Sequence, residues 1–302
     1  MTVQTFVGSF TKIATTGNQD IPIGSAAVTA MQAGPWAMKL WTAGSDDASG
    51  TWSANVVASV GLVAGNGESS ITQYAVCAYS LDANATSETA RRMAAKTITM
   101  PTSDGTSVHW EAEMGADPLP SSTAMRLNWT TNNANTDYDD TVINYMIFTG
   151  LTGAKVVTWS VPNSAGSFSV TGVGFASDLV LHAANAAYPS VPASVANAYF
   201  SFGAMNSAGE QWANSFYSQD GVADSNTSRW QRTDACFVMT DINEAQSDRA
   251  AYTSMDADGF TINFATAANW GTTTQAISLC MDGIASKIGQ LRDKISNAVQ
   301  EI

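Results

Sequence analysis

The sequence contains few side chains suited to acid–base chemistry, and its two histidines, His109 and His182, are the first to consider. Glu111 and Glu113 follow His109 at every second position, so all three should share one face of an expected strand. A histidine beside a carboxylate suits proton transfer or metal binding. No second histidine is near in sequence, and we therefore predict a solvated strand face. His182 lies in an apolar stretch, where we expect a hydrogen-bonded, partly buried residue.

Acidic clusters occur at 46–47, 137–140 and 256–259. The last reads Asp-Ala-Asp-Gly and resembles the start of a calcium loop, but it lacks the remaining ligands and the closing Glu. Asp-Gly between two apolar stretches is a strong hairpin signal, so we predict a turn there. We expect residues 137–140 in a solvated hairpin loop. No cofactor is predicted, and a loosely bound surface Ca²⁺ at that loop is the alternative.

Three tryptophans stand among loop-forming residues, which favours surface positions for them. An indole beside Asn, Asp or Ser side chains can stack on a sugar ring or anchor a partner protein. The alternative is that these rings cover the edges of a core or close contacts between subunits. The candidate ligand-binding residues are Trp52, Trp230 and Trp270.

Motifs that mark an enzyme are missing from the sequence. It has no G-x-S-x-G nucleophile elbow, no P-loop and no dinucleotide-binding fingerprint. Two carboxylates of a glycan-cleaving enzyme could still converge from distant positions, so a glycan depolymerase is the weaker alternative. We assign no catalytic residue and no metal ligand, and predict that the protein is not an enzyme.

The composition limits the partners. The formal net charge is −13, from 26 acidic and 13 basic residues, and such a surface repels nucleic acid. No apolar run is long enough to span a membrane, and the N-terminus does not read as a signal peptide. We therefore expect synthesis in the cytoplasm without export through a signal peptide. The three cysteines, Cys77, Cys236 and Cys280, are expected to be buried small hydrophobic residues.

An internal repeat organises the sequence. Short alternating or apolar stretches separated by Gly, Asn, Ser and Asp predict an all-β protein with two tandem β-sandwich-like domains and almost no helix before residue 282. We place domain 1 at 1–152 and its duplicate, domain 2, at 153–282. The stretches that correspond are 10–24 with 157–173, 73–93 with 211–231, and 125–151 with 260–284.

The last segment, 283–302, has a different pattern. Its apolar residues recur at gaps of three and four, which predicts one stripe along a short amphipathic helix. An Ile-rich stripe favours three or more helices in a bundle, so we predict a homotrimer. A helix that folds back on its own subunit, or docks on another protein, is the alternative. The stripe consists of Ile284, Ile288, Leu291, Ile295, Val299 and Ile302.

Two motifs of the second half carry a resemblance. Residues 170–181 contain Val-Thr-Gly-Val-Gly-Phe followed by Asp-Leu-Val-Leu, and residues 255–264 read Met-Asp-Ala-Asp-Gly-Phe-Thr-Ile-Asn-Phe. These stretches resemble a module of tailed-bacteriophage structural proteins, found among tail-associated and other virion proteins. The first half is a degenerate match, with Ala-Gly-Pro-Trp at 33–36. The module brings no catalytic residues with it.

The resemblance implies a structural component exposed on a phage virion, either a tail fibre or spike or a capsid decoration or head fibre. Its partners would be its own copies and other virion proteins, and assembly in the cytoplasm fits the missing export signal. A carbohydrate- or receptor-binding protein for host recognition is the alternative, which the loop tryptophans would serve. The sequence distinguishes neither head from tail nor one host ligand from another.

Overall fold

The chain folds into β-sheets with one short helix among the residues described. The computed structural model describes residues 2–44, 55–81, 85–102, 105–133, 140–187, 195–224, 226–241, 246–267 and 274–284. The predicted all-β class with two tandem sandwich-like domains is confirmed, because the strands form two pairs of sheets. Within the described ranges, no helix has the length and apolar character needed to cross a membrane.

The first half contributes a large and a small antiparallel sheet. The large sheet A has seven strands in the order β1-β10-β3-β4-β5-β6-β14, and the small sheet B has four in the order β2-β9-β8-β7. Their bounds are β1 Gln4–Thr11, β2 Gly17–Pro22, β3 Pro35–Thr42, β4 Val56–Asn66, β5 Ser69–Leu81, β6 Glu88–Ala94, β7 Ile98–Pro101, β8 Val108–Glu113, β9 Ala124–Asn132 and β10 Val142–Thr149.

The second half repeats this plan. Sheet C has six strands in the order β11-β21-β13-β15-β16-β17, and sheet D has four in the order β12-β20-β19-β18. Their bounds are β11 Gly153–Ser160, β12 Gly166–Val170, β13 Leu179–Ala184, β15 Ala198–Asn206, β16 Gln211–Ser218, β17 Thr227–Arg232, β18 Phe237–Thr240, β19 Gln246–Asp256, β20 Gly259–Thr266 and β21 Gln275–Asp282. The short strand β14, Val195–Ala196, leaves this half and pairs with β6.

Two glycines mark the same backbone crossing in both halves. A Cβ on Gly61 of β4 would overlap the carbonyl oxygen of Thr97, and a Cβ on Gly203 of β15 would overlap that of Cys236. The main chain just before β7 in the first half, and just before β18 in the second, therefore passes directly against the large sheet, which only glycine allows. Gly61 pairs with Ala75, and Gly203 pairs with Ala213. The two halves therefore match residue by residue in this region.

The helix α1, Ser25–Gln32, is the one helix among the described residues, which agrees with the expectation of almost no helix before residue 282, although its position was not predicted. Its sequence, Ser-Ala-Ala-Val-Thr-Ala-Met-Gln, is rich in alanine, which has the highest helix propensity. Gly24 turns the chain into the helix at a φ of 86°. Val28 and Met31 are buried and join the core of the first half. The second half has a loop between β12 and β13 instead.

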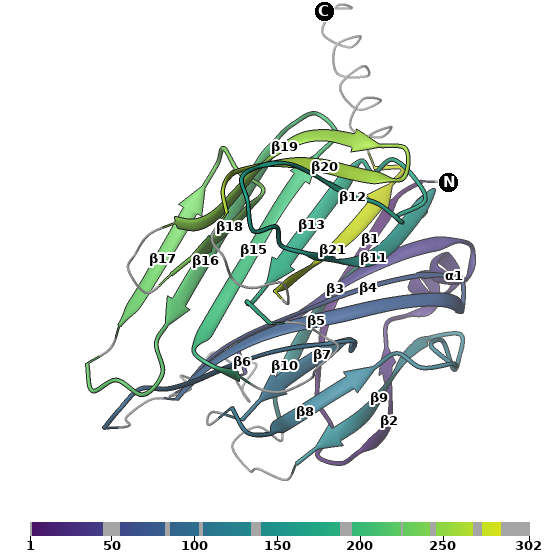
Figure 1. The fold of residues 1–302 in the computed structure, drawn as a ribbon. Helices are drawn as coiled ribbons and strands as arrows, with labels where there is room; N and C mark the ends of the chain where they lie inside the picture. The colour runs from purple at the N-terminus through teal and green to yellow at the C-terminus, as the bar shows by residue number, and fades with distance from the viewer. Residues whose placement is uncertain are drawn as a thin grey trace, which may run out of the picture.

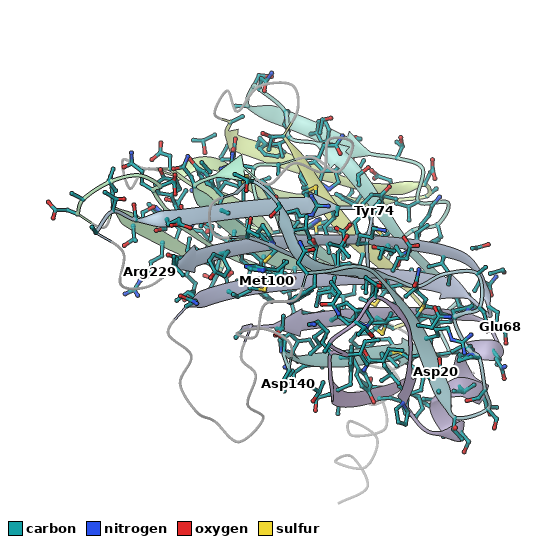
Figure 2. All side chains as sticks on the ribbon, turned by 90° about the horizontal axis from the view of Figure 1, so that it is seen from below. Asp20, Glu68, Tyr74, Met100, Asp140 and Arg229 are labelled. Atoms are coloured by element: carbon teal, nitrogen blue, oxygen red, sulfur yellow. The ribbon has the colours of Figure 1, made fainter. Side chains whose placement is uncertain are left out.

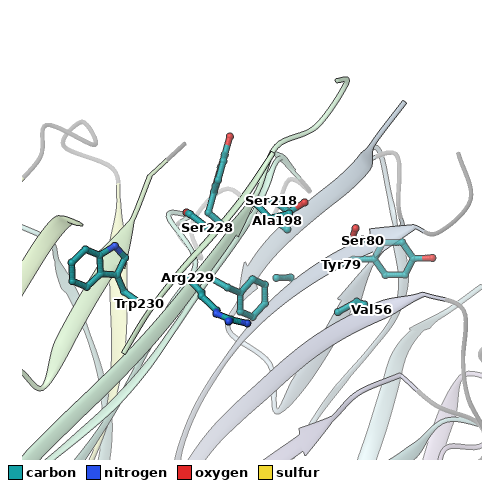
Figure 3. Close-up of a pocket in the computed structure, with 12 residues that line it drawn as sticks. Val56, Tyr79, Ser80, Ala198, Ser218, Ser228, Arg229 and Trp230 are labelled. Atoms are coloured by element: carbon teal, nitrogen blue, oxygen red, sulfur yellow. The ribbon is translucent and has the colours of Figure 1, made fainter. Parts of the chain in front are cut away.

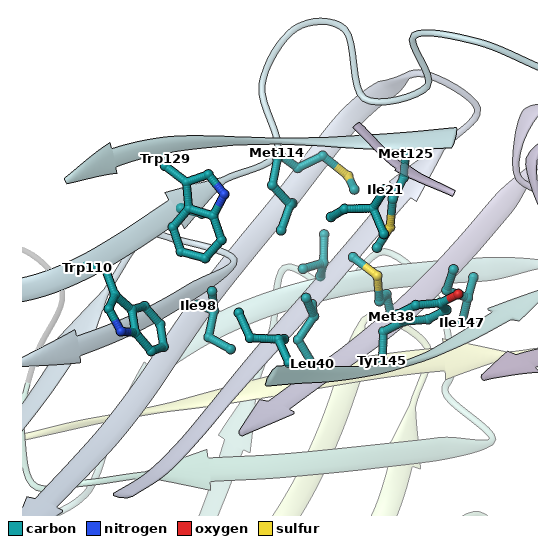
Figure 4. Close-up of a cluster of buried hydrophobic side chains, with 14 of the residues drawn as sticks. Ile21, Met38, Leu40, Ile98, Trp110, Met114, Met125, Trp129, Tyr145 and Ile147 are labelled. Carbon is teal, nitrogen blue, oxygen red and sulfur yellow. The ribbon is translucent and has the colours of Figure 1, made fainter. Parts of the chain in front are cut away.

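The sheets stack in four layers, in the order B, A, C, D (Figure 1). The core between sheets B and A contains the perpendicular pair Trp110 and Trp129, with ring centroids 5.9 Å apart. Ile98 lies beside these rings, and Leu40 and Met38 continue the core toward Tyr145 (Figure 4). The core between C and D centres on Trp159, which contacts Phe168 and Phe237 edgewise or at a tilt. Each half is thus a sandwich with its own core.

A third core lies between the two halves, where the outer faces of sheets A and C meet. Leu62 and Val76 from sheet A pack with Phe200, Phe202 and Leu279 from sheet C. Strands β4 and β15 are therefore buried on both faces over most of their length. A strand buried on both faces carries nearly continuous apolar residues instead of an alternating pattern. The two sandwiches share this apolar interface over the broad faces of both large sheets.

Polar side chains also join the halves. The side-chain amide of Asn185, which is fully buried, donates to the backbone carbonyls of Cys77, at 3.0 Å, and Arg92. The Ser87 hydroxyl donates to the Gln219 carbonyl at 2.6 Å, and the Thr89 N–H donates to the Asp220 carboxylate at 2.6 Å. These bonds fasten the start of β6 to the loop after β16, so they set the edge where the large sheets diverge.

Candidate functional site

The predicted solvated face around His109 is wrong. His109 and Glu111 are each only 8% exposed. Glu111 accepts from the Arg92 guanidinium at 2.7 Å, and the Thr99 hydroxyl also reaches it. Glu113 pairs with Lys96 at 2.6 Å. The alternating pattern suggested exposure, but Arg92 from β6 supplies the charge that lets Glu111 be buried.

His182 is more buried than expected, with no exposed surface. Its Nδ1 lies 2.8 Å from the Ser278 hydroxyl, which also accepts from Trp159 Nε1 at 2.8 Å. Burial lowers the pKa of His182 to about 3, because the imidazolium would lose its hydration. A serine next to a histidine can act as a nucleophile and its base. Here both side chains are sealed in the core with Phe260, so we interpret them as structural.

The Asp-Ala-Asp-Gly stretch forms the predicted turn, between β19 and β20. Asp258 accepts the backbone N–H groups of Gly172 at 3.0 Å and Gly174 at 2.6 Å. These bonds to its charged form lower the pKa of the Asp258 carboxyl. Asp256 accepts from the hydroxyls of Ser254 and Thr261. Both aspartate carboxylates therefore accept hydrogen bonds from groups of their own chain.

This turn brings the stretches 171–174 and 256–259 together. The Thr-Gly-Val-Gly stretch, 171–174, lies against the hairpin turn because Asp258 accepts both of its glycine N–H groups. A Cβ on Gly259 would overlap the Val170 carbonyl oxygen. Lys155 adds a bond to the Gly172 carbonyl at 2.6 Å. We name this arrangement the motif clamp, and its residues stabilise the loop between β12 and β13.

The cysteines are buried, as predicted, and none is in a disulfide. Burial raises the pKa of the Cys236 and Cys280 thiols to about 12, and it raises that of Cys77 further. A thiol with so high a pKa is a poor nucleophile at neutral pH. Among the described residues, no three His, Cys, Asp or Glu side chains gather into a group that would hold a metal ion.

A groove of about 690 Å³ lies between the two halves. It lies where β16 and β17 of sheet C diverge from β4 and β5 of sheet A (Figure 3). Its volume falls in the range of sites for small ligands, about 300–1,000 Å³. We call it the edge groove. Its lining consists of Val56, Ala78, Tyr79, Ser80, Ala198, Phe216, Tyr217, Ser218, Thr227, Ser228, Arg229 and Trp230.

One cation projects into the edge groove. Arg229 is exposed, and Figure 3 places it on the side of β17 that faces Val56 and Ser80. Figure 2 places it at the opposite end of the molecule from Asp20 and Glu68. No Asp or Glu is among the described residues that line the groove. The groove therefore combines apolar surface, hydroxyl groups and one positive charge.

Trp230 borders the edge groove, but its ring points to the other side of β17 from Arg229 (Figure 3). Ser228, on the same face, bonds to Thr240 at the end of β18. Arg232 lies over the indole at 5.8 Å. Trp230 is half-buried. Trp52 and Trp270 lie outside the described residues.

Other predicted positions fall partly or wholly outside the described residues. Ile284 is described, and it packs against the apolar interface between the halves. The remaining stripe residues, Ile288 to Ile302, and the acidic residues 46–47 and 137–139 lie outside. Sequence reasoning missed Arg229 and Phe216 as site residues. The repeat contained a signal, because Arg229 stands where the first half has Arg91.

Comparisons with known proteins give no family. No family model and no curated protein matches the chain. Among solved structures, the di-domain aromatase/cyclase StfQ from the steffimycin biosynthetic pathway aligns at 8% identity over 92% of this chain and 84% of that chain, with a TM-score of 0.09. An N-terminal dehydratase from the difficidin assembly line aligns at 7% identity over 97% and 98%, with a TM-score of 0.09. These scores are too low to support a shared fold or function.

Proposed function

We propose that this chain is a non-enzymatic structural component exposed on a bacteriophage virion, as a tail fibre or spike or as a decoration of the capsid. The observation that carries the proposal is the motif clamp. The two stretches that resemble the phage module contact each other through Asp258, Gly172 and Gly174. Their shared residues therefore serve the fold, as expected for a module of structural proteins.

The positions of the histidines also favour a structural protein. His182 and Ser278 are sealed in a core and Glu111 is bound to Arg92, so these groups have no open contact with a substrate. The apolar interface between the halves adds a further buried layer. Such a body suits a particle component that must stay folded outside a cell.

Purified particles test this proposal. Peptide mass spectrometry should find the chain in several copies per particle, and electron microscopy with a labelled antibody should place it at a regular outer position. Its presence in the lysate but not in washed particles would contradict the proposal. A head or a tail position in these images would decide between decoration and fibre.

We further propose that residues 283–302 join the copies as a homotrimer. The support is the spacing of the apolar stripe. Deleting 285–302, or combining Ile288→Asp with Ile295→Asp, should give monomers in light scattering while the β-sheet circular dichroism is kept. Gln290→Asp, off the stripe, is the matched control. A monomeric intact protein would contradict this proposal.

Recognition of a host receptor or carbohydrate is the second candidate function. The edge groove favours it, because an open hollow with aromatic, hydroxyl and cationic groups is equipped for a polar ligand. The whole protein, incubated with host cell-wall fractions, should sediment with one of them. Failure to bind any fraction would leave the structural role alone.

A further inference from the structure

The edge groove has the chemistry of a binding site for an acidic sugar. We propose that it binds a glycan segment that carries a carboxylate, with Arg229 as the partner of that carboxylate. The inference rests on the second candidate function and names its ligand class. It is carried by a comparison between two arginines at matching positions of the repeat.

Arg91 and Arg229 occupy the same place in their halves. Arg91 of β6 pairs in register with Ala78 of β5, and Arg229 of β17 pairs with Phe216 of β16. The neighbouring glutamines agree with this match. Gln73 accepts from the Met114 N–H at 2.8 Å, and Gln211 accepts from the Tyr252 N–H at 2.7 Å.

In the first half this arginine is fully engaged. The Arg91 guanidinium donates to the carbonyls of Ala186, at 3.3 Å, Asn197, at 3.0 Å, and Ala196. It also lies over the Tyr199 ring at 4.8 Å. The second half thus offers Arg91 a row of oxygen acceptors beside a flat ring.

Arg229 has no such partners within the part of the chain that the structure describes. None of the ion pairs or hydrogen bonds found there involves its guanidinium, although the chain has twice as many acidic as basic residues. Arg92, Arg126 and Arg232 are each bound to carboxylates. An exposed guanidinium in a groove without acidic lining is a ready partner for a carboxylate, which it can bind through two parallel hydrogen bonds.

The rest of the lining suits a sugar. Ser80, Ser218 and Thr227 supply hydroxyl groups that can donate to and accept from sugar hydroxyls. Phe216 and Val56, which is 63% exposed, supply apolar surface for the C–H face of a sugar ring. The alternation of polar and apolar groups matches the two kinds of surface that a pyranose presents.

A peptide fits this groove less well. An extended peptide binds by pairing its backbone with a free strand edge. The strand β16 is paired on both sides, with β15 and β17. The strand β17 ends sheet C and has a free edge among the described residues, but it lines the groove with the side chains of Thr227 and Arg229. The groove therefore offers side chains to a ligand, and few unpaired backbone groups.

Titration calorimetry with the full chain tests the proposal. A short oligogalacturonate is the acidic probe, and its methyl ester is the neutral probe of the same shape. The acid should bind and its ester should bind at least tenfold more weakly, because a bond to a charged group is worth about 1.5–3 kcal/mol. Equal binding of the acid and its ester would overturn the role of the carboxylate. The proposal would also be overturned if the chain bound neither the oligogalacturonate nor a second acidic glycan, a polysialate.

Variants identify the residue. Arg229→Gln should weaken acid binding by about 10- to 100-fold, whereas Arg229→Lys should retain part of it. Arg249→Gln, which removes the same charge from β19 outside the groove lining, is the matched control and should bind normally. Val56→Glu should also weaken binding, because it adds a like charge to the ligand's at an exposed position. Unchanged binding by Arg229→Gln would overturn the assignment.

The binding experiments test the glycan site independently of the proposed structural role. Finding the chain in purified particles does not depend on calorimetry, so a virion protein without glycan affinity would sink only this inference. Tight binding to an acidic peptide by the same groove, lost in Arg229→Gln, would also overturn it.

Discussion

In the first half of the molecule, both adjacent arginines of β6 are bound by other residues. The two matching positions of β17 hold an arginine and a tryptophan, and they point to opposite sides of the strand. Arg91 reaches across to the second half, and Arg92 binds Glu111 of its own half. At the matching positions Arg229 is exposed in the edge groove, and Trp230 points to the other side of β17 (Figure 3). The arginine at this strand position therefore holds the two halves together in the first half, and it is exposed to solvent in the second.

The difference shows how packing decides the chemistry of a repeated residue. The strand order and the Gly61 and Gly203 crossings are the same in both halves, so the backbone offers the same starting point. Residues of the second half cover the position of Arg91, because β14 pairs with β6 there and the Tyr199 ring of β15 lies against the guanidinium. Arg229 of β17 remains exposed in the edge groove. A site can therefore arise from an offset between two similar bodies.

The largest effect should come from removing the shared crossing. Gly61→Ala and Gly203→Ala each place a methyl group on a backbone carbonyl that has no room to move, so we expect either variant to lose the cooperative fold. Gly115→Ala, where a Cβ meets open space, is the control and should behave like the wild type. Urea unfolding followed by tryptophan fluorescence measures the outcome. A stable Gly203→Ala variant beside an unfolded Gly61→Ala variant would show that the crossings differ.

The buried ion pair of the first half should come next. Glu111→Ala leaves the Arg92 guanidinium buried without its carboxylate, and we expect a loss of about 3–5 kcal/mol in the free energy of unfolding. Arg232→Ala removes an ion pair whose Asp234 partner is 60% exposed, and should cost less than about 1 kcal/mol. Similar losses in the two variants would contradict the contrast between buried and exposed pairs.

The histidine of the second half should make stability depend on pH. The pKa of His182 is about 3 in the folded chain and about 6.5 when unfolded, so the unfolded state binds the proton first as the pH falls. Above about pH 6.5 the histidine is neutral in both states and does not lower the free energy of unfolding. Between about pH 6.5 and pH 5 this free energy should fall by about 2 kcal/mol. His182→Gln should flatten this slope in thermal melts between pH 7 and pH 5, whatever its effect at pH 7. An unchanged slope would assign the pH dependence to other groups.

The motif clamp should give the smallest effect. Asp258→Asn weakens the bonds to Gly172 and Gly174, so the melting temperature should fall at neutral pH. The folded pKa of Asp258 is lowered, and its contribution is therefore present above about pH 4 and lost as the pH falls further. The wild type and the variant should converge in acid. Asp224→Asn, in the loop before β17, is a control that should not alter the melt.

Some of the fold could be predicted from sequence because local signals were sufficient. Short strands, Asp-Gly turns and the repeat predict paired β-sandwiches, and the hairpin at 256–259 follows from turn chemistry alone. The helix α1 was missed because eight residues between two strands give too few turns for a clear period. The buried pair of Arg92 and Glu111 was missed because the partner comes from another strand, beyond the reach of spacing arguments.

The interface between the halves had a signal that alternation arguments overlook. Residues 60–64 read Val-Gly-Leu-Val-Ala, an apolar run where a one-faced sandwich strand would alternate. That run indicates burial on both faces, which is how β4 packs. The edge groove could not be predicted, since it depends on how far one sheet is displaced across the other. The one signal in the sequence was the repeat, in which Arg229 occupies the position equivalent to Arg91.

The short connection between the halves determines how their contact responds to dilution of the protein. β10 ends at Thr149 and β11 begins at Gly153, so a few residues tether two large apolar faces. Two separate sandwiches that met through the same faces would dissociate as their concentration fell. A tether of this length keeps their local concentration high, in the millimolar range for short linkers, however few molecules are present. The contact between the halves, and the groove at its edge, should therefore persist when a single copy is left far from any other.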